Sequence, residues 1–465
     1  MSAAASAVVS RLAGIVGDPH LVANAAGLEA YGIGGMRPSA AVRPGSAEEV
    51  SEMLKFAAAE KLGLVPCGAR TKLEMGLPPR KYDLAVDISR LDRIIAYDPD
   101  DLTLSVEAGI PLHKLSATLA ERGQFLPLQV PFFQHATIGG TIASAMDSAL
   151  RQFYGTARDF ILGMEFVTGD GTLAKSGGRV VKNVTGYDLH KLMIGAFGTL
   201  GVITKINFRT FPLQRETRAF IASFESASGA LDLRGRVSRS PLKPLTMEIF
   251  SPGAADVFYS EAAAQVEPGP LAPNILANGK WAFTAGFART GSVLERCEAE
   301  MRAMAEEAGA ASVSVLRHDQ IAGAFGRKRE FVRIVLESSP AATILKAGVL
   351  PSRMGEILAE VESAAANESL RSATMARGVG VIYAALLPDA LSEAALQRVA
   401  RAASRIQAAC DKAGGQATVP WCPSEWKSAL KTWGADRGDL PLMRRLKSAF
   451  DPHGILNPGR FVGGL

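Results

Sequence analysis

The spacing of apolar residues predicts two helices in the first third of the chain. Within residues 46–61, Val50, Met53, Leu54 and Ala57 recur at helical intervals. Ser46 can cap this helix, and Glu49 three residues later completes a capping box. A second helix is predicted over residues 111–122, because a proline stands at its start, where a helix tolerates it.

Short apolar runs between and after these helices predict strands. Residues 102–107 alternate in polarity, which is typical of a strand with one buried face. Gly169-Asp170-Gly171 stands between two apolar runs and predicts a hairpin turn. The expected strands cover residues 63–66, 83–88, 94–97, 102–107, 163–168 and 201–209. A helix followed by several short strands favours an α+β fold over a doubly wound parallel sheet.

The pattern changes after residue 214, where strands alternate with long helices rich in Ala and Glu. We expect strands over residues 219–224, 246–250, 281–287 and 331–336. Helices are expected over residues 293–308, 352–365 and 391–413, and residues 268–273, with three prolines, predict a surface loop.

Composition and charge exclude several classes of protein. The chain has 465 residues, of which 48% are hydrophobic and 21% charged, so it can build large cores and is not globally disordered. The net charge of +5 is too weak to indicate a nucleic-acid partner. Four widely spaced cysteines without a CxxC favour a reducing, cytoplasmic compartment. No apolar run approaches the ~20 residues of a membrane span, and we interpret the first 16 residues as an amphipathic helix instead of a signal peptide.

Two stretches carry candidate chemistry. The loop Pro66-Cys67-Gly68-Ala69-Arg70-Thr71-Lys72 follows a predicted strand and can turn several backbone N–H groups toward a phosphate, although it can equally be a solvated connection. Residues 136–144 hold Gly139 and Gly140 among small side chains, which lets the backbone approach a flat cofactor or a neighbouring helix. Neither GxGxxG after a strand nor GxxxxGK[ST] is present, so the common nicotinamide and P-loop motifs are excluded.

The order of motifs resembles the FAD-binding domain of the FAD-linked oxidases, the family of vanillyl-alcohol oxidase and p-cresol methylhydroxylase. After the two stretches above come Arg151-x-x-Tyr154-Gly155-x-x-Arg158-Asp159 and the run from Gly178 through Lys182-Asn183 to Leu192. Residues 198–204 (GTLGVIT) follow, and the chain closes with residues 450–460 (FDPHGILNPGR). Lys182–Leu192 and the segment 346–352 (KAGVLPS) look most like the FAD-binding subunit of glycolate oxidase.

The resemblance implies an α+β fold with a two-part FAD-binding domain of the p-cresol methylhydroxylase type and an α+β cap domain. We expect four parts: an N-terminal helical segment (1–35), the FAD-binding domain (36–214), the cap or substrate domain (215–420) and a C-terminal segment (421–465) that returns to the FAD domain.

The resemblance also implies a set of cofactor-binding residues. Backbone N–H groups of the loop Pro66, Cys67, Gly68, Ala69, Arg70, Thr71 and Lys72 would hold the FAD pyrophosphate. The flavin and diphosphate would lie along Thr137, Gly139, Gly140, Ala143 and Ser144, in a crevice lined by Arg151, Tyr154 and Gly155. Val202 and Ile203 would meet the cofactor through their backbone, and Asn457 would approach the isoalloxazine.

The chain departs from the family pattern at three places. Ala69 and Arg70 occupy positions that are often glycine, which leaves the individual phosphate contacts open. Family members with covalent FAD often have a histidine in this loop, and none stands between Pro66 and Lys72, so we expect noncovalent FAD. The metal-binding His-Gly-Asp-Gly-Asn motif of the D-2-hydroxyacid dehydrogenases is missing, and Gln416 stands where the glycolate oxidase subunit often has a histidine, so no metal site is expected and no catalytic base is assigned.

The expected function is that of an FAD-dependent oxidoreductase acting on a small 2-hydroxy acid such as glycolate. The resemblance implies that the chain is the FAD-binding subunit of a glycolate oxidase or dehydrogenase complex, with a second flavin subunit and an iron–sulfur subunit as partners. Through them it would lie at the inner face of a membrane. The alternatives are a stand-alone FAD-dependent alcohol or D-lactate-type dehydrogenase and a non-catalytic flavin-binding scaffold subunit.

Overall fold

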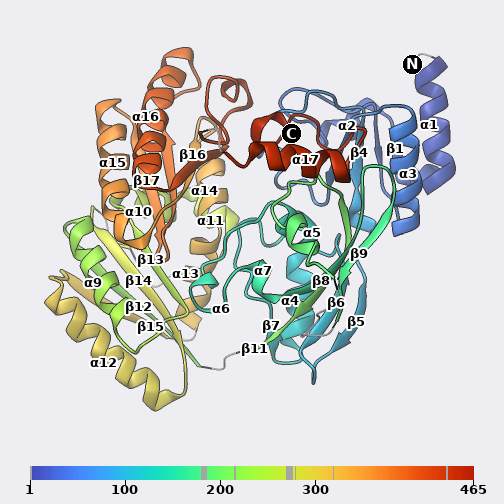
Figure 1. The fold of residues 1–465 in the computed structure, drawn as a ribbon. Coiled ribbons are helices and arrows are strands. Elements are labelled where there is room, and N and C mark those ends of the chain that lie inside the picture. The colour runs from blue at the N-terminus through green and yellow to red at the C-terminus, as the bar shows by residue number, and fades with distance from the viewer. Residues whose placement is uncertain are drawn as a thin grey trace.

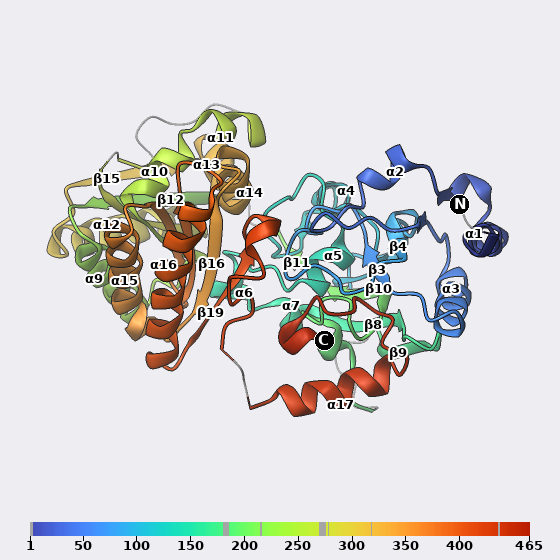
Figure 2. The same ribbon diagram turned by 90° about the horizontal axis from the view of Figure 1, so that it is seen from above.

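The chain folds into two lobes that lie side by side (Figures 1 and 2). A computed structural model describes residues 3–179, 186–213, 216–268, 276–277, 279–317, 319–435 and 438–465. The motif residues Lys182 and Asn183, and most of the proline loop at 268–273, lie outside these residues. The predicted α+β class is confirmed, because helices and mixed or antiparallel sheets share both lobes.

The first sheet of the N-terminal lobe has the strand order β1-β2-β4-β3, with β2, β4 and β3 parallel. Helix α3 (Ala47–Ala59) confirms the predicted helix and its Ser46 cap, because Ser46 Oγ accepts the Glu49 N–H at 3.1 Å. The second bond differs from the predicted capping box: the Glu49 carboxylate accepts the N–H of Gly45, at 2.7 Å, instead of that of Ser46. The other elements are α1 (Ala3–Val16), α2 (Ala25–Glu29), β1 (Leu21–Val22), β2 (Ala40–Val42), β3 (Leu64–Cys67) and β4 (Leu84–Asp87).

The second sheet of this lobe is antiparallel and has the order β5-β6-β10-β8-β9. Its strands are β5 (Ile94–Asp98), β6 (Thr103–Glu107), β8 (Ile161–Val167), β9 (Leu173–Gly177) and β10 (Val202–Arg209), and the predicted turn at residues 169–171 joins β8 to β9. Around it lie α4 (Leu112–Ala120), α5 (Ile138–Ala143), α6 (Arg151–Tyr154), α7 (Ala157–Phe160), α8 (His190–Met193) and the small pair β7 (Gln124–Phe125) and β11 (Phe211–Pro212).

The second lobe is built on one antiparallel sheet of order β15-β12-β14-β13-β17-β18-β16-β19. Its strands are β12 (Thr217–Phe224), β13 (Thr246–Phe250), β14 (Trp281–Ala288), β15 (Ser312–Arg317), β16 (Thr343–Gly348), β17 (Arg371–Arg377), β18 (Val381–Leu387) and β19 (Gln416–Trp421). The helices are α9 (Ala227–Arg239), α10 (Pro252–Phe258), α11 (Glu261–Val266), α12 (Gly291–Glu307), α13 (Asp319–Arg329), α14 (Phe331–Ser338), α15 (Met354–Asn367) and α16 (Glu393–Lys412).

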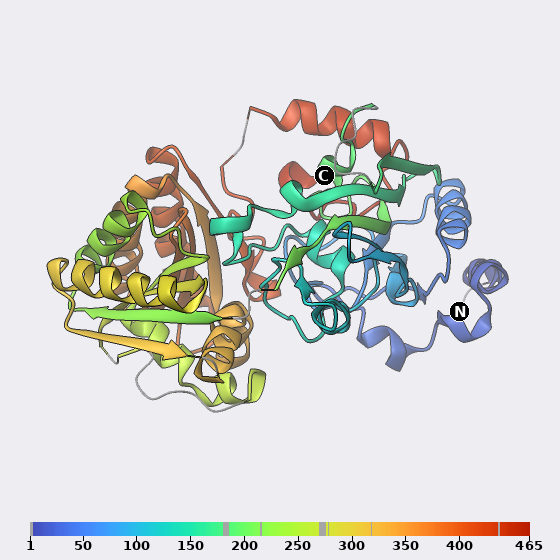
Figure 3. The same ribbon diagram turned by 90° about the horizontal axis from the view of Figure 1, so that it is seen from below.

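Both faces of this sheet are covered, which explains its nearly continuous apolar strands. Successive residues of β16 and β18 belong to different cores: Ile344 and Tyr383 face the core that continues into the first lobe, whereas Leu345 and Ala384 face the core beneath the long helices. This alternation follows from the two-residue period of a strand. Figure 3 shows α12 running along one side of this sheet.

One predicted element is wrong. The β-branched residues at 331–336 predict a strand, but helix α14 covers Phe331–Ser338. Its buried residues Phe331, Val332, Ile334 and Val335 form a helical stripe that packs on α10 and α11. Tertiary packing therefore overrides the local strand preference of these residues.

The end of the chain lies against the N-terminal lobe. Helix α17 (Leu440–Phe450) runs along that lobe (Figures 2 and 3), and Leu64 donates its N–H to Ile455 O while accepting the N–H of Asn457, both at 2.8 Å. The last residues thus extend beside β3, next to the loop that follows it. Among the described residues, no helix is both long and apolar enough to cross a membrane.

Candidate functional site

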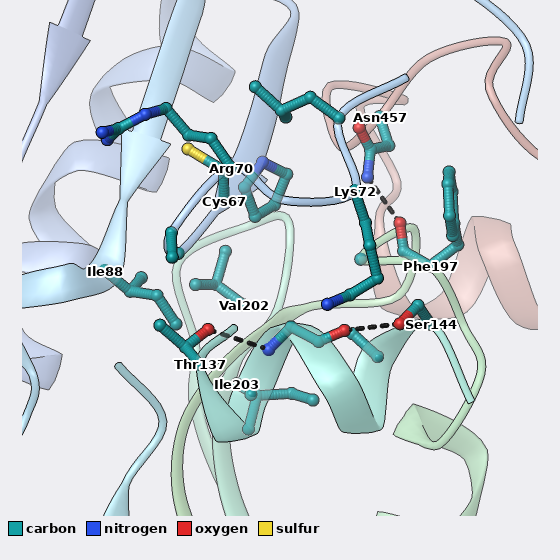
Figure 4. A pocket seen from close by; sticks show the side chains of 18 of the residues that line it. Cys67, Arg70, Lys72, Ile88, Thr137, Ser144, Phe197, Val202, Ile203 and Asn457 are labelled. Carbon is teal, nitrogen blue, oxygen red and sulfur yellow. Dashed lines mark hydrogen bonds between the residues drawn. The ribbon is translucent and has the colours of Figure 1, made fainter. Parts of the chain in front are cut away.

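Most of the predicted cofactor residues line one pocket in the N-terminal lobe (Figure 4). The pocket encloses about 720 Å³ of space, its open mouth included. The predicted residues that line it are Pro66, Cys67, Gly68, Ala69, Arg70, Thr71, Lys72, Thr137, Gly139, Gly140, Ala143, Ser144, Val202, Ile203 and Asn457. Segments far apart in the sequence, at the ends of β3 and β4, in α5, at the start of β10 and at the C-terminus, therefore meet around one space.

Six lining residues were not among those expected: Leu73, Ile88, Phe197, Gly198, Gly201 and Arg460. Gly198, Gly201 and Arg460 lie inside the quoted motifs, so the sequence held a signal for them. Leu73 and Ile88 are ordinary apolar residues, and only their position in the fold brings them to the pocket.

Three predicted residues lie outside the lining of this pocket. Arg151 donates to Asp147 Oδ1 at 2.6 Å. Tyr154 packs edge-on against Phe125 and Phe211, with ring centroids 5.4 and 4.9 Å away. Gly155 has a φ of 79° and ends α6, a conformation that favours glycine. In this structure these three residues therefore stabilise the segment of chain that runs from the pocket toward the second lobe.

The loop after β3 presents unused backbone donors to the pocket. Within the described chain, none of the N–H groups of Ala69, Arg70, Thr71 and Lys72 donates a hydrogen bond to another protein group. Gly68 lets the loop lie directly on α5, since a Cβ atom there would stand 2.2 Å from Thr137 Oγ1. Free backbone donors gathered in a tight loop are a common phosphate site.

The two adjacent glycines of α5 have different surroundings. A Cβ on Gly139 would stand 2.7 Å from the Ala108 Cβ and 2.8 Å from its carbonyl oxygen, so this glycine lets α5 pack against the end of β6. A Cβ on Gly140 would meet only Thr137 Oγ1, at 3.2 Å, and otherwise faces the pocket. Thr137 caps the helix by accepting the Gly140 N–H at 3.3 Å. Gly139 therefore allows α5 to pack closely, whereas Gly140 leaves open space on the side of the pocket.

Lys72 brings a positive charge into the pocket. Its Nζ hydrogen-bonds Thr71 Oγ1 at 3.1 Å and lies 5.7 Å from the ring centre of Phe132. Burial lowers the pKa of Lys72 to about 8, and the nearby carboxylate of Glu330 opposes that shift. A lysine desolvated in this way gains from a negatively charged ligand, which restores the favourable environment of the ammonium group.

The C-terminal segment closes the pocket from another side. Asn457 has a φ of 47°, a conformation that asparagine tolerates better than most residues, and its side-chain amide donates to Phe197 O. The Arg460 guanidinium is buried and donates to the carbonyl oxygens of Leu73, Met75 and Leu77. These bonds tie the last residues of the chain to the loop that begins at Pro66.

A second group of polar side chains lies where the lobes meet, and sequence reasoning did not identify it as a site. Asp147, three residues after Ser144, pairs with Arg151 and lies 3.5 Å from the Nε of Arg377 on β17. Arg377 also pairs with Glu248, which in turn pairs with Lys328. We call this group, together with Lys346 and Tyr383, the boundary cluster: Asp147, Arg151, Glu248, Lys328, Lys346, Arg377 and Tyr383.

Lys346 and Tyr383 stand opposite each other on neighbouring strands of the cap sheet. The Lys346 Nζ lies 5.9 Å from the centre of the Tyr383 ring, and burial lowers the pKa of Lys346. The Tyr383 hydroxyl is buried and donates no hydrogen bond within the described structure, and burial raises its pKa. Two members of the boundary cluster had a sequence signal: Arg151, in a quoted motif, and Lys346, the first residue of the quoted KAGVLPS segment. The described residues hold no group of three or more His, Cys, Asp or Glu side chains suited to a metal ion.

The pocket residues fit an FAD molecule. Unused N–H donors and Lys72 match a diphosphate, the open face of Gly140 leaves room for a cofactor, and the apolar Ile88, Val202 and Ile203 suit an aromatic ring system. The segment from Ser144 to Asp147 connects this pocket with the boundary cluster.

Comparison with known proteins agrees with this assignment. Residues 38–177 match the family described as FAD binding domain, and residues 213–461 match the family described as FAD linked oxidases, C-terminal domain. Over 425 residues the chain is 25% identical to the glycolate oxidase subunit GlcD of Bacillus subtilis (strain 168), covering 91% of this chain and 88% of that protein. It is 38% identical over 165 residues to the glycolate oxidase subunit GlcE of Escherichia coli (strain K12), covering 35% of this chain and 47% of that one.

Other relatives carry different names. The D-lactate dehydrogenase of Anaerostipes hadrus is 25% identical over 436 residues, which is 92% of this chain and 90% of that protein. The solved structure of p-cresol methylhydroxylase with substrate bound aligns with 99% of this chain and 97% of that one at a TM-score of 0.78 and 17% identity, which shows the shared fold. The order of the motifs, the cofactor pocket and the matched families together establish that this chain belongs to the FAD-linked oxidases.

Proposed function

We propose that this oxidoreductase binds FAD noncovalently and acts on a small 2-hydroxy acid such as glycolate, as the FAD-binding subunit of a larger complex. The observation that carries the substrate class is the charge of the boundary cluster. It holds four basic side chains, Arg151, Lys328, Lys346 and Arg377, but only two acidic ones, Asp147 and Glu248. Buried charges need partners, so an excess of cations favours an anionic ligand.

Lys346 is the member of the cluster best suited to a carboxylate. In the part of the chain that the structure describes, no acidic side chain lies at ion-pair distance from it. A substrate carboxylate would offset the burial that lowers its pKa. We propose that Lys346 binds the carboxylate of the hydroxy acid next to the flavin.

Tyr383 would assist by hydrogen bonding. Its hydroxyl is a buried donor without an acceptor among the described residues, and its raised pKa keeps the proton on the phenol at neutral pH. It can therefore donate to a substrate oxygen but is a poor acceptor of the substrate proton. When bound, FAD supplies the hydride acceptor for the alcohol carbon. We assign the catalytic base to no residue of this chain.

The noncovalent attachment rests on the chemistry of the lining. None of the described residues that line the pocket is a histidine, and the side chain of Cys67 is largely buried. Burial and the nearby Asp87 raise the pKa of this thiol, which disfavours the nucleophilic thiolate. Acid precipitation should therefore release the yellow cofactor into the supernatant, and colour that stays with the precipitate would contradict this part of the proposal.

The subunit role rests on two relatives that are named as glycolate oxidase subunits and on Gln416. The Gln416 amide donates to Trp433 O at 3.2 Å, and an amide cannot accept a proton at neutral pH. A partner with the full set of catalytic groups, and an iron–sulfur subunit to take up electrons, would complete the reaction. The D-lactate dehydrogenase relatives favour the alternative, a stand-alone D-lactate-type dehydrogenase.

The test is anaerobic reduction of the bound flavin in a stopped-flow instrument. We expect glycolate or D-lactate to bleach the flavin slowly in the isolated chain and faster with co-purified partners, whereas ethylene glycol, which lacks the carboxylate, should not. Lys346→Met should raise the acid concentration needed for half-maximal reduction by ~10-fold or more, and Lys346→Arg should raise it less. The exposed Lys175→Met serves as control. Equal reduction by ethylene glycol would overturn the substrate class, and reduction of the isolated chain at ~1–10³ s⁻¹ would favour the stand-alone enzyme.

A further inference from the structure

Arg70 occupies a backbone conformation that usually belongs to glycine. Its φ is 62°, in the left-handed region, within the loop that presents backbone donors to the cofactor pocket. A residue with a Cβ atom is strained in this conformation, because the Cβ crowds the backbone. Such strain persists when the surrounding contacts hold it in place.

The Arg70 side chain makes those contacts on the side away from the cofactor. Its Nη1 donates to Asp87 Oδ2 at 2.7 Å and lies 3.3 Å from the Tyr31 hydroxyl. The guanidinium carbon stands 4.8 Å from the centre of the Tyr31 ring. Figure 4 shows that this side chain points away from Thr137 and Ser144, whereas Lys72 extends toward them.

The partners of Arg70 are themselves fixed. The Asp87 carboxylate is buried at the end of β4, where it also accepts the Tyr31 hydroxyl at 2.7 Å and the Ser89 N–H at 3.0 Å. Burial and the Asp87 charge raise the pKa of Tyr31, so its hydroxyl remains a donor. A cation stacked on an aromatic ring and bonded to a buried carboxylate is held in one orientation.

We propose that Arg70 is a positioning residue that locks the cofactor loop through Asp87 and Tyr31 and does not itself contact the FAD phosphates. By fixing the left-handed turn, the lock would keep the N–H groups of residues 69–72 directed at the diphosphate before the cofactor arrives. The inference rests on the assignment of this pocket to FAD. It gives two neighbouring basic residues separate roles, with Arg70 holding the backbone and Lys72 facing the ligand.

The test measures the dissociation constant of FAD from the apoprotein by flavin fluorescence. We expect Arg70→Ala and Asp87→Asn each to weaken FAD binding by ~10-fold, and the double variant to be little weaker than either single one, because both break the same lock. A direct Arg70–phosphate contact predicts otherwise: Asp87→Asn would leave FAD binding unchanged or tighter. That result, or additive losses in the double variant, would overturn the proposal.

A glycine at position 70 should restore part of the FAD affinity. It could not do so if the affinity had been lost with a direct contact between Arg70 and a phosphate. Arg70→Gly removes the guanidinium as fully as Arg70→Ala does, but it adopts the left-handed turn without strain. We therefore expect FAD to bind Arg70→Gly several-fold more tightly than Arg70→Ala; equal affinities would contradict the lock. Should Asp87→Asn fail to fold, Tyr31→Phe removes one bond of the lock and should weaken binding less. The exposed Arg37→Ala is the matched control and should leave FAD binding unchanged.

Discussion

Gly68 and Thr137 touch across the pocket wall, because a Cβ atom on Gly68 would stand 2.2 Å from Thr137 Oγ1 and 2.8 Å from Thr137 Cγ2. Thr137 also caps α5, so this contact joins the loop after β3 to the start of the helix beneath it. The two cofactor segments therefore hold their relative position through one glycine and one threonine.

Replacing this glycine should disrupt both segments. Gly68→Ala forces the loop away from α5, and we expect FAD affinity to fall by ~10-fold or more together with a loss of ~1–3 kcal/mol in the free energy of unfolding. Flavin fluorescence and urea denaturation measure the two effects. Gly14→Ala, where nothing lies within 4 Å of the added Cβ, is the control. Unchanged FAD binding in Gly68→Ala would show that the loop can shift without harm.

The two glycines of α5 should respond differently to the same substitution. Gly139→Ala drives a methyl group into Ala108 and should lower the free energy of unfolding by ~1–3 kcal/mol. Gly140→Ala points into the pocket and should weaken FAD binding while changing stability by less than ~1 kcal/mol. Thermal unfolding of the apoproteins and FAD titration separate these outcomes. Stability losses of equal size would contradict the difference between the crowded Gly139 and the open Gly140.

FAD binding should depend on pH through Lys72. Its pKa is lowered to about 8, so the apoprotein carries a charged Lys72 below that pH and a neutral one above it. Because the diphosphate favours the charged form, binding above pH 8 requires uptake of a proton, and the dissociation constant should rise by up to ~10-fold per pH unit. Below pH 8 this contribution should be constant. In Lys72→Met the dissociation constant of FAD should depend less on pH. The same pH dependence in this variant as in the unchanged protein would show that another group causes the effect.

Glu330, which lies in the second lobe, should influence the pH dependence of FAD binding. Its carboxylate accepts the N–H groups of Phe132 and Phe133 at 2.7 and 3.0 Å, and its charge opposes the lowering of the Lys72 pKa. Glu330→Gln should therefore move the loss of FAD affinity to lower pH. The amide can accept only one of the two N–H groups well, so the free energy of unfolding should fall by ~1–3 kcal/mol. The exposed Glu337→Gln, on the helix that Glu330 precedes, is the control. A profile that moves to higher pH would contradict this electrostatic link between the lobes.

Elements with local signals could be predicted from the amino-acid pattern alone. The capped helix α3, the hairpin turn at residues 169–171 and most strands follow from spacing, caps and turn residues, which act within a few positions of the chain. The ordered motifs also indicated most of the residues that line the pocket of the N-terminal lobe, because glycines and short loops leave a recognisable pattern in the sequence.

The direction in which each pocket residue points could not be predicted in this way, because it depends on contacts formed by the folded chain. The sequence pattern does not distinguish Arg70 from Lys72, or Gly139 from Gly140. In the structure, Asp87 and Tyr31 bind the Arg70 side chain. Ala108 lies so close to Gly139 that a Cβ atom there would clash with it. The boundary cluster is assembled from both lobes, and α14 is helical because of the surface against which it packs. Side-chain direction and buried charge pairing depend on contacts between residues far apart in the chain, and a local pattern cannot encode them.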